Sequence, residues 1–463
     1  MLAENRDLRR TVAAGDFPAF YCGAVVARER LDPYRAAPLE ACERARTVAP
    51  GTTPLPNGIA PAPLPGYVLA LVVPLSLLPF GIAACIWYAL LIAAVAATVE
   101  MLRALTGLPR AALAAAALGS EIVASVTYGQ LAPLATLGVA AAALALRRER
   151  SRRAALWCAL VLLQPQVAPG PLAALLLWRP RARIVVAGVC ALLGLISLVT
   201  LGVAANVEYA RSVVGAQALA EAPFDIQLSL TWLLVFFGSG ESAALHVAWF
   251  EYVVLLVGGV LLAGALANRL GLREALVVVP AAAAVLGGTY LHVFQLAVAL
   301  PCALVLAARV PAARAYAWIA VALLAVPWEA TGSRLILALS AAAVATIAWT
   351  ALHGVTVRVR VLAACAAVAF VALEPVAAAR VPNAIVRPAP ATAAFLATGV
   401  DPALASGAHG VAPRARPRRV EASWRTFAQK TPEWAGLAAL FAALAAAAVA
   451  ARRRRPALSA SRA

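Results

Sequence analysis

Residues Gly81–Val99 read GIAACIWYALLIAAVAATV, nineteen consecutive residues without a charged side chain. An α-helix needs about 20 mainly apolar residues to cross the hydrocarbon core of a bilayer, so this run predicts a membrane-spanning helix. Comparable apolar runs recur from Gly66 to Ala451, 63% of all residues are hydrophobic, and the mean hydropathy is +0.86. Because a backbone inside lipid must satisfy its own hydrogen bonds, we expect an all-α polytopic membrane protein rather than a soluble globular one.

The formal net charge of +18 comes from arginines that stand in short clusters between the apolar runs. In a soluble protein this charge would suggest nucleic acid, but positive residues beside spanning helices are better explained by orientation in the membrane. If every cluster is cytoplasmic, two crossings separate each neighbouring pair, which predicts about 10–13 transmembrane helices, several of them short or broken. The clusters lie at residues 103–110, 147–153, 179–183, 269–273, 309–314, 358–360 and 452–455.

This topology predicts that most of the polar residues that interrupt the apolar runs lie at the outer face of the membrane. Polar groups at membrane depth are costly and usually face a cavity, so their convergence predicts one outer-facing cavity. Short helices and helices broken at Gly or Pro are tolerated where they line such a cavity. The converging residues are Asp16, Tyr128–Gln130, Gln164–Gln166, the segment 206–227, Thr289–His292 and Trp328–Glu329.

Composition divides the chain into five regions. They are an extracytoplasmic N-terminal loop region (1–66), a transmembrane core (67–310), additional transmembrane helices (311–378), an extracytoplasmic Pro- and Arg-rich loop (379–434), and a last helix with a basic cytoplasmic tail (435–463). Residues 35–66 are rich in Pro and Gly and predict an ordered loop without helix. Most of the later loop, from residue 380, fits either a partly disordered segment or a lid over the cavity.

The N-terminal region contains a polar and aromatic block, Gly15–Tyr34, that reads GDFPAFYCGAVVARERLDPY. Asp16 is flanked by Phe17 and Phe20 and is a candidate base at the membrane surface. The alternative is that Asp16 only caps a helix that begins at Phe17-Pro18, and one carboxylate can do both. Nothing upstream resembles a signal segment that would carry Asp16 outside, so we expect that a first membrane helix is missing; translocation without a signal is the alternative.

Cys22 and Cys42 both lie in the polar N-terminal region, whereas the other five cysteines lie within apolar runs. If this region is outside the cell, Cys22 and Cys42 are candidates for a disulfide. No Cys or His spacing predicts a metal site. The only lysine, Lys430, is interpreted as a consequence of codon bias and is given no function.

Seven segments, in a consistent order and spacing, cover residues 15–310. They are GDFPAFYCGA (15–24), LDPY (31–34), VLALVVPLSLLPFGIAACIWYALL (68–91), YGQLAPLATLGVAAAAL (128–144), ALVLLQPQVAP (159–169), FDIQLSLTWLL (224–234) and GGTYLHVFQLAVALP (287–301). Together they resemble glycosyltransferase family 87, the polyprenol-phosphate-mannose-dependent mannosyltransferases of the GT-C class. The chain departs from the family at Gln164, where a lysine is common, and in its first helix.

The resemblance implies a GT-C-like bundle in the cell membrane with its active site on the extracytoplasmic side. Such enzymes transfer a hexose, here expected to be mannose, from a polyprenyl phosphate to a lipid or glycan acceptor with inversion. A single base suffices for this reaction, and the resemblance gives that role to Asp16. It implies no cofactor and no metal, and its partners are membrane lipid, the lipid-linked sugar and the acceptor, not nucleic acid; the oligomeric state is left open.

The leaving phosphate needs cations or hydrogen-bond donors, for which the candidates are His292, Arg28 and Arg334. The candidates for sugar or acceptor binding are Tyr21, Gln130, Gln164, Asp225 and Gln227. Amides suit sugars because they donate and accept hydrogen bonds at once. Each candidate also has a plainer interpretation. The histidine can form ordinary hydrogen bonds at a helix end, the arginines can lie in solvent or among lipid headgroups, and the amides can form hydrogen bonds between helices.

Two other functions compete with sugar transfer. A lipid or solute transporter would be favoured by an internal repeat or by charges buried in mid-membrane. A catalytically inactive relative that serves as an assembly partner is favoured by Gln164 and by the missing first helix, and is disfavoured by the retention of Asp16.

Overall fold

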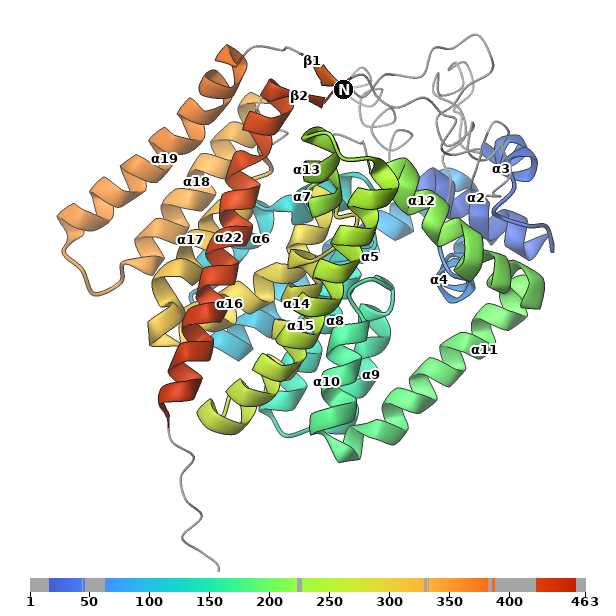
Figure 1. The fold of residues 1–463 in the computed structure, drawn as a ribbon, viewed down its shortest axis with the longest axis horizontal. Helices are drawn as coiled ribbons and strands as arrows, with labels where there is room; N and C mark the ends of the chain where they lie inside the picture. Colours follow the sequence, from blue (N-terminus) through green and yellow to red (C-terminus); the bar gives the residue numbers. More distant parts are fainter. Residues whose placement is uncertain are drawn as a thin grey trace, which may run out of the picture.

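The computed structural model describes residues 16–43, 45, 63–222, 227–328, 331, 333–381, 385–387 and 422–454, and these are almost entirely helical (Figure 1). The two short strands, β1 (Ile385–Arg387) and β2 (Ala422–Ser423), pair antiparallel. The α-helices are α2 (Phe17–Arg28), α3 (Ala36–Cys42), α4 (Gly66–Val72), α5 (Phe80–Thr106), α6 (Arg110–Leu118), α7 (Glu121–Thr127), α8 (Ala132–Arg147), α9 (Ser151–Val161), α10 (Pro169–Trp178), α11 (Arg183–Glu208), α12 (Val214–Glu221), α13 (Leu230–Phe236), α14 (Glu241–Leu270), α15 (Ala275–Leu286), α16 (Leu300–Arg309), α17 (Arg314–Leu324), α18 (Arg334–Ala351), α19 (Val357–Arg380) and α22 (Trp424–Arg453). Short 3-10 or π segments lie at Leu75–Leu77, Pro180–Ala182, Tyr209–Val213, Val293–Ala299 and Pro311–Ala313.

Six helices in the described part of the chain are long and apolar enough to cross a membrane, or up to eight if two bent pairs each count as one span. The six contain α5, α11, α14, α18, α19 and α22. This confirms an all-α polytopic membrane protein. The 10–13 helices that we expected included short ones, and α8, α10 and α15 are apolar helices of this kind, with 10–17 residues.

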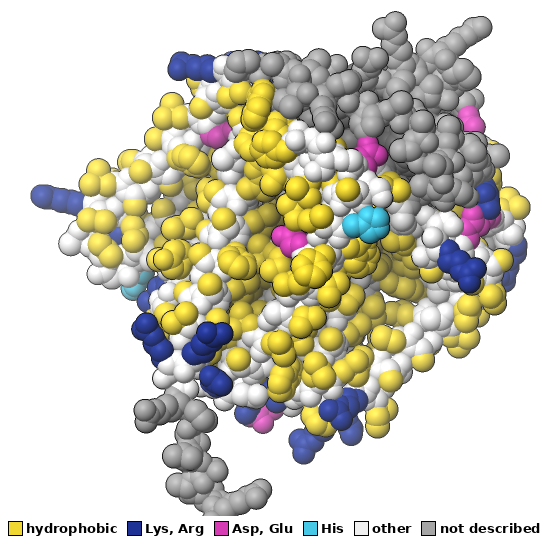
Figure 2. Space-filling model, in the orientation of Figure 1, with side chains coloured by type: hydrophobic (Ala, Val, Ile, Leu, Met, Phe, Trp, Pro, Cys, Tyr) yellow, Lys and Arg dark blue, Asp and Glu magenta, His cyan; other side chains and the backbone are white. Residues whose placement is uncertain are grey.

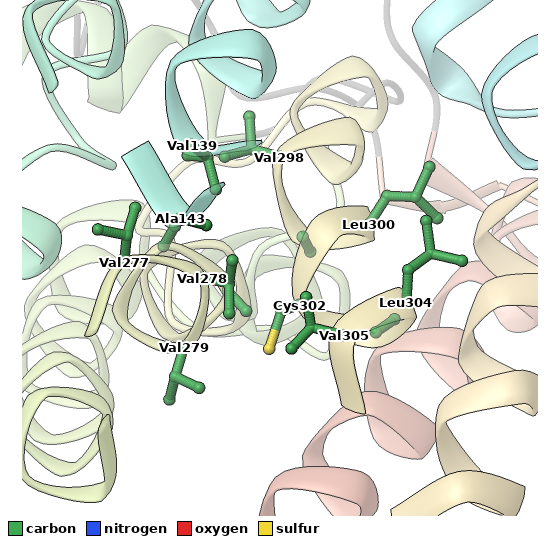
Figure 3. Packing of buried hydrophobic residues seen from close by; sticks show 14 of the residues in the cluster. Val139, Ala143, Val277, Val278, Val279, Val298, Leu300, Cys302, Leu304 and Val305 are labelled. Carbon is green, nitrogen blue, oxygen red and sulfur yellow. The ribbon is translucent and has the colours of Figure 1, made fainter. Parts of the chain in front are cut away.

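The centre of the bundle consists of α8, α15 and α16, whose side chains are mostly Ala, Val and Leu. Every residue of α15 from Ala275 to Val285 is buried, as expected for a helix that is apolar on all sides. Figure 3 shows Ala143 of α8 beside Val277 and Val278 of α15, in a cluster that includes Cys302 of α16. Small side chains let these helices approach closely, and they form a rigid base under the turns at their ends.

The basic turns meet at one end of the bundle, the lower end in Figure 2, where many of the Lys and Arg side chains gather. Arg273, in the turn between α14 and α15, forms an ion pair with Glu149 in the turn between α8 and α9. Arg309, at the end of α16, lies 3.9 Å from Glu274. The turns that contain the polar candidate residues lie at the other end.

The N-terminal region is more helical than we expected. Residues 35–66 were expected to contain no helix, but α3 occupies Ala36–Cys42 and packs on α2. Cys22 of α2 and Cys42 of α3 form a disulfide bond that fixes this contact. Short apolar runs in a Pro-rich context therefore fold here because α2 and the disulfide hold them, not because of their own propensity.

Helix α22 begins at Trp424, eleven residues before the apolar run that starts at Ala435. Its first turns are polar in sequence but pack on α13 and the segment before it, so the helix extends beyond the apolar run. The part of the proposed lid between residues 388 and 421 lies outside the described residues, as does Asp225.

Candidate functional site

Asp16 stands directly before α2, at the N-cap position, with Pro18 in the first turn of the helix. Its side chain makes no capping hydrogen bond to the helix, so capping alone does not explain the carboxylate. The Asp16 backbone N–H donates to the carbonyl oxygen of Tyr128 at 2.7 Å. The start of α2 is thereby tied to the turn between α7 and α8.

Gln130 lies in that same turn, and its side-chain amide Nε2 donates a hydrogen bond to the Oδ2 of Asp16. Two residues from the list of candidates, 114 positions apart in the sequence, are thus in direct contact. The amide therefore orients the carboxylate.

Gly129 allows the turn to approach α2. Its φ is +71°, a left-handed conformation that other residues rarely adopt, and a Cβ there would lie 3.0 Å from the Cβ of Phe17. The carbonyl oxygen of Gly129 accepts a hydrogen bond from Trp87 Nε1 of α5 at 2.8 Å. Because Phe17 and Trp87 also stack, at 5.5 Å between ring centroids, α2, α5 and the turn form one packed unit.

Tyr21, a candidate for sugar or acceptor binding, is buried in the same aromatic cluster. Its ring packs edge-on against Phe80, and its hydroxyl donates to the carbonyl oxygen of Leu78 at 2.8 Å. The structure therefore places Tyr21 in the packing behind Asp16, one turn further along α2.

His292 lies before the 3-10 segment Val293–Ala299, and its ring is 4.8 Å from that of Phe294. Phe294 in turn lies 6.2 Å from the ring of Tyr128, whose carbonyl oxygen binds Asp16. Aromatic contacts therefore connect the histidine with the turn that carries Gln130. His292 is partly exposed, whereas Phe294 is buried, so the imidazole stands at the edge of the packed cluster.

Gln295 and Gln164 form a chain of hydrogen bonds that starts at the backbone of His292. The N–H of His292 donates to Gln295 Oε1 at 3.1 Å, and Gln295 Nε2 donates to Gln164 Oε1 at 3.3 Å. Gln166 Nε2 also donates to Gln164 Oε1, at 2.6 Å. Gln164, the position where a lysine is common in the family, is 5% exposed and serves as a buried acceptor.

Gln227 lies opposite His292, and the two residues form an isolated antiparallel bridge. The Oε1 of Gln227 accepts from the N–H of Leu291 at 2.7 Å, and the N–H of Leu228 donates to the carbonyl oxygen of Leu291 at the same distance. Gln227 is completely buried, so it shapes the backbone around His292.

Lys430 of α22 was given no function on sequence alone, yet its side chain is 1% exposed and donates to the carbonyl oxygen of Gln227. Its ammonium nitrogen also lies 3.9 Å from the centroid of the Trp232 ring. Trp434, on the same helix, donates from Nε1 to the carbonyl oxygen of Leu228 at 3.2 Å. Lys430 precedes the apolar run of α22 that starts at Ala435, so no pattern in the sequence marked it as buried.

The two arginine candidates lie apart from Asp16. Arg28 ends α2, twelve residues on, which corresponds to about 18 Å along a helix. Its guanidinium donates to the carbonyl oxygen of Ser76 at 2.6 Å. Arg334 begins α18 and is exposed. The structure thus joins Asp16 with Gln130, and His292 with Gln164 and Gln227, but brings neither arginine to these groups.

The described residues include no group of three or more His, Cys, Asp or Glu that could hold a metal ion. The polar groups of the site are amides, one carboxylate and one imidazole. Such a set can take a proton, orient hydroxyl groups and donate hydrogen bonds to an anion.

The model of glycosyltransferase family 87 matches residues 65–293, which include Gln130, Gln164, Gln227 and His292. Neither the curated proteins nor the solved structures contain a match to this chain. The match confirms the family resemblance over these residues, and Asp16 and Lys430 lie outside it.

Proposed function

We propose that this chain, a membrane glycosyltransferase of family 87, transfers a hexose from a polyprenyl phosphate to an extracytoplasmic lipid or glycan with inversion. Mannose is the expected sugar, in keeping with the resemblance of residues 15–310. The contact between Asp16 and Gln130 carries the proposal, because it holds a carboxylate that does not cap its helix at the end of the bundle away from the basic turns.

In the proposed step, the acceptor hydroxyl oxygen attacks the anomeric carbon of the donor sugar from the side opposite the phosphate. The new bond between carbon and acceptor oxygen forms as the bond between the anomeric carbon and the phosphate oxygen breaks. The bonding electrons leave with the polyprenyl phosphate, and the acceptor proton passes to the Asp16 carboxylate. Gln130 keeps that carboxylate oriented during the transfer.

The leaving phosphate gains negative charge and is stabilised by hydrogen-bond donors placed beforehand. His292 is the candidate donor, because its ring is partly exposed while its backbone is held by Gln295 and by the bridge to Gln227. Gln130 and Gln227 lie on the side where the sugar or acceptor binds. Gln130 contributes its side chain there, and Gln227 contributes through the backbone that it positions.

Two observations support an extracytoplasmic site. Arginine-rich turns favour the cytoplasmic side. Asp16 is bonded to Tyr128 in the turn before α8, whereas the basic turn with the Arg273–Glu149 ion pair follows the other end of α8. The Cys22–Cys42 disulfide joins the helix that follows Asp16 to α3, and disulfides persist in oxidising compartments.

The proposal is tested by following label from polyprenyl-phosphate-mannose into the lipid and glycan fractions of membranes that contain the full chain. Asp16→Asn keeps the size of the side chain and an oxygen that can accept from Gln130, but it removes the base. We expect transfer to fall at least about a hundredfold. Asp32→Asn is the matched control, since Asp32 follows the C-terminal end of α2 and binds the Tyr34 N–H and Arg35.

Equal transfer by the wild type and Asp16→Asn would remove Asp16 from the mechanism. Absence of transfer from any lipid-linked hexose would favour a catalytically inactive relative, for which the buried amide of Gln164 in place of a lysine is the supporting observation. The configuration of the product at the anomeric carbon decides between inversion and retention.

A further inference from the structure

The segment Gln227–Leu228 connects α22 with the backbone that carries His292. On one side, its two carbonyl oxygens accept hydrogen bonds from Lys430 Nζ and Trp434 Nε1. On the other side, Gln227 Oε1 and the Leu228 N–H bond the backbone of Leu291, next to His292. Neither carbonyl can move without breaking a bond to α22.

Burying the charged side chain of Lys430 costs free energy unless other groups bind it. A fully buried ammonium group must be compensated by partners, and two of them here are the carbonyl oxygen of Gln227 and the face of Trp232. The same helix turn packs aromatic rings against α13, with the rings of Trp232 and Trp434 5.7 Å apart. This environment fixes the ammonium in one place, so its bond to Gln227 defines where the segment lies.

We propose that Lys430 is a positioning residue of the transfer site, which holds His292 in place through the backbone of Gln227. Lys430 does not touch the substrate; it acts through the bridge between Gln227 and His292. This inference rests on the proposed function for its catalytic meaning, but the coupling between Lys430 and His292 is measurable without any substrate. It also makes α22, outside the family match, a part of the site.

The test uses membranes with the full chain and four variants. Lys430→Met keeps much of the length and removes the charge, and Lys430→Arg restores a cation that can bind the carbonyl and the ring. Trp434→Phe removes the indole N–H and keeps a smaller aromatic ring, and the control variant makes the same change in ring size. Trp424→Phe is the matched control, because Trp424 of the same helix packs on Phe236 and Phe427.

The substrate-independent readout is the rate at which diethyl pyrocarbonate acylates His292, followed by mass spectrometry, with the exposed His246 as the internal reference. We expect Lys430→Met and Trp434→Phe to change the rate at His292 severalfold relative to His246, Lys430→Arg to restore it in part, and Trp424→Phe to leave it unchanged. In the transfer assay, Lys430→Met is expected to lower kcat about tenfold or more with a smaller change in KM.

An unchanged relative rate at His292 in Lys430→Met would overturn the inference, even if transfer fell. A parallel rise at His292 and His246 would also overturn it, because that result indicates general loosening of the fold. If the wild type transfers no sugar, the proposed function fails, and the acylation rates alone still decide whether Lys430 positions His292.

Discussion

Replacing Gly129 with alanine tests whether the close approach of the turn between α7 and α8 sets the position of Asp16. The new Cβ would lie 3.0 Å from the Cβ of Phe17 and 3.4 Å from the hydroxyl oxygen of Tyr88. Phe17 is fully buried and stacks on both Trp87 and Phe80. It therefore cannot move away without disturbing α2, which begins beside Asp16.

The substitution has two separable costs. A side chain at φ +71° costs about 1–2 kcal/mol of stability in any surroundings. The contact with Phe17 also requires a shift of a few tenths of an ångström, which passes to the bond between Asp16 and Gln130. Gly107 provides the matched control: its φ is +75°, but nothing lies within 4 Å of the Cβ that alanine would add.

We expect Gly129→Ala and Gly107→Ala to lose similar stability from the backbone alone, with a further loss in Gly129→Ala from the contact. Only Gly129→Ala is expected to lose transfer activity, by about tenfold or more, since small misplacements of reacting groups are costly. Thermal unfolding in detergent measures the first effect, and label transfer per folded protein measures the second. Equal activity of the two variants would refute the argument that this approach positions Asp16.

Three further predictions concern stability and orientation. Replacing both Cys22 and Cys42 with alanine should destabilise the N-terminal helices by about 3 kcal/mol, which a melting curve compared with and without reductant will show. Gln164→Leu removes an acceptor that the buried amide of Gln295 and the partly buried amide of Gln166 share, and should cost about 1–3 kcal/mol in the same assay. A cysteine in place of Ser242 should react with a membrane-impermeant maleimide applied from outside intact cells, whereas one in place of Ser151 should not.

The controls for these predictions come from the chain itself. Reductant should lower the melting temperature of the wild type but not that of the double cysteine variant. The unsubstituted chain measures labelling of its native cysteines. Labelling of both new cysteines from the same side would contradict the assignment of the basic turns to the cytoplasm.

The helices of the bundle could be predicted from the sequence because their apolar runs end abruptly at charged turns. The run Leu131–Leu146, for example, differs by one residue at each end from α8. The placement of Asp16 and Gln130 at the same end of the bundle followed from the same topology. Their direct contact could not be predicted, because it depends on how segments far apart in the sequence pack.

The sequence was misleading where polar residues are buried. The first turns of α22 contain Arg425, Gln429 and Lys430, so no apolar run marks their helix, and its start at Trp424 depends on packing against α13. A lysine carries no sign of burial in the sequence. Its burial depends on a carbonyl oxygen 203 positions earlier and on an aromatic ring, and both become visible only when the helices are assembled.

The bond between Lys430 and Gln227 also has a meaning for synthesis in the cell. A ribosome makes Gln227 and His292 long before it makes Lys430, 203 residues after Gln227. Until α22 inserts, the carbonyl oxygens of Gln227 and Leu228 lack the hydrogen bonds from Lys430 and Trp434. The nascent chain therefore passes through a stage in which the earlier helices are made but the segment opposite His292 is not yet held, and α22 then adds both these donors and its own share of the core.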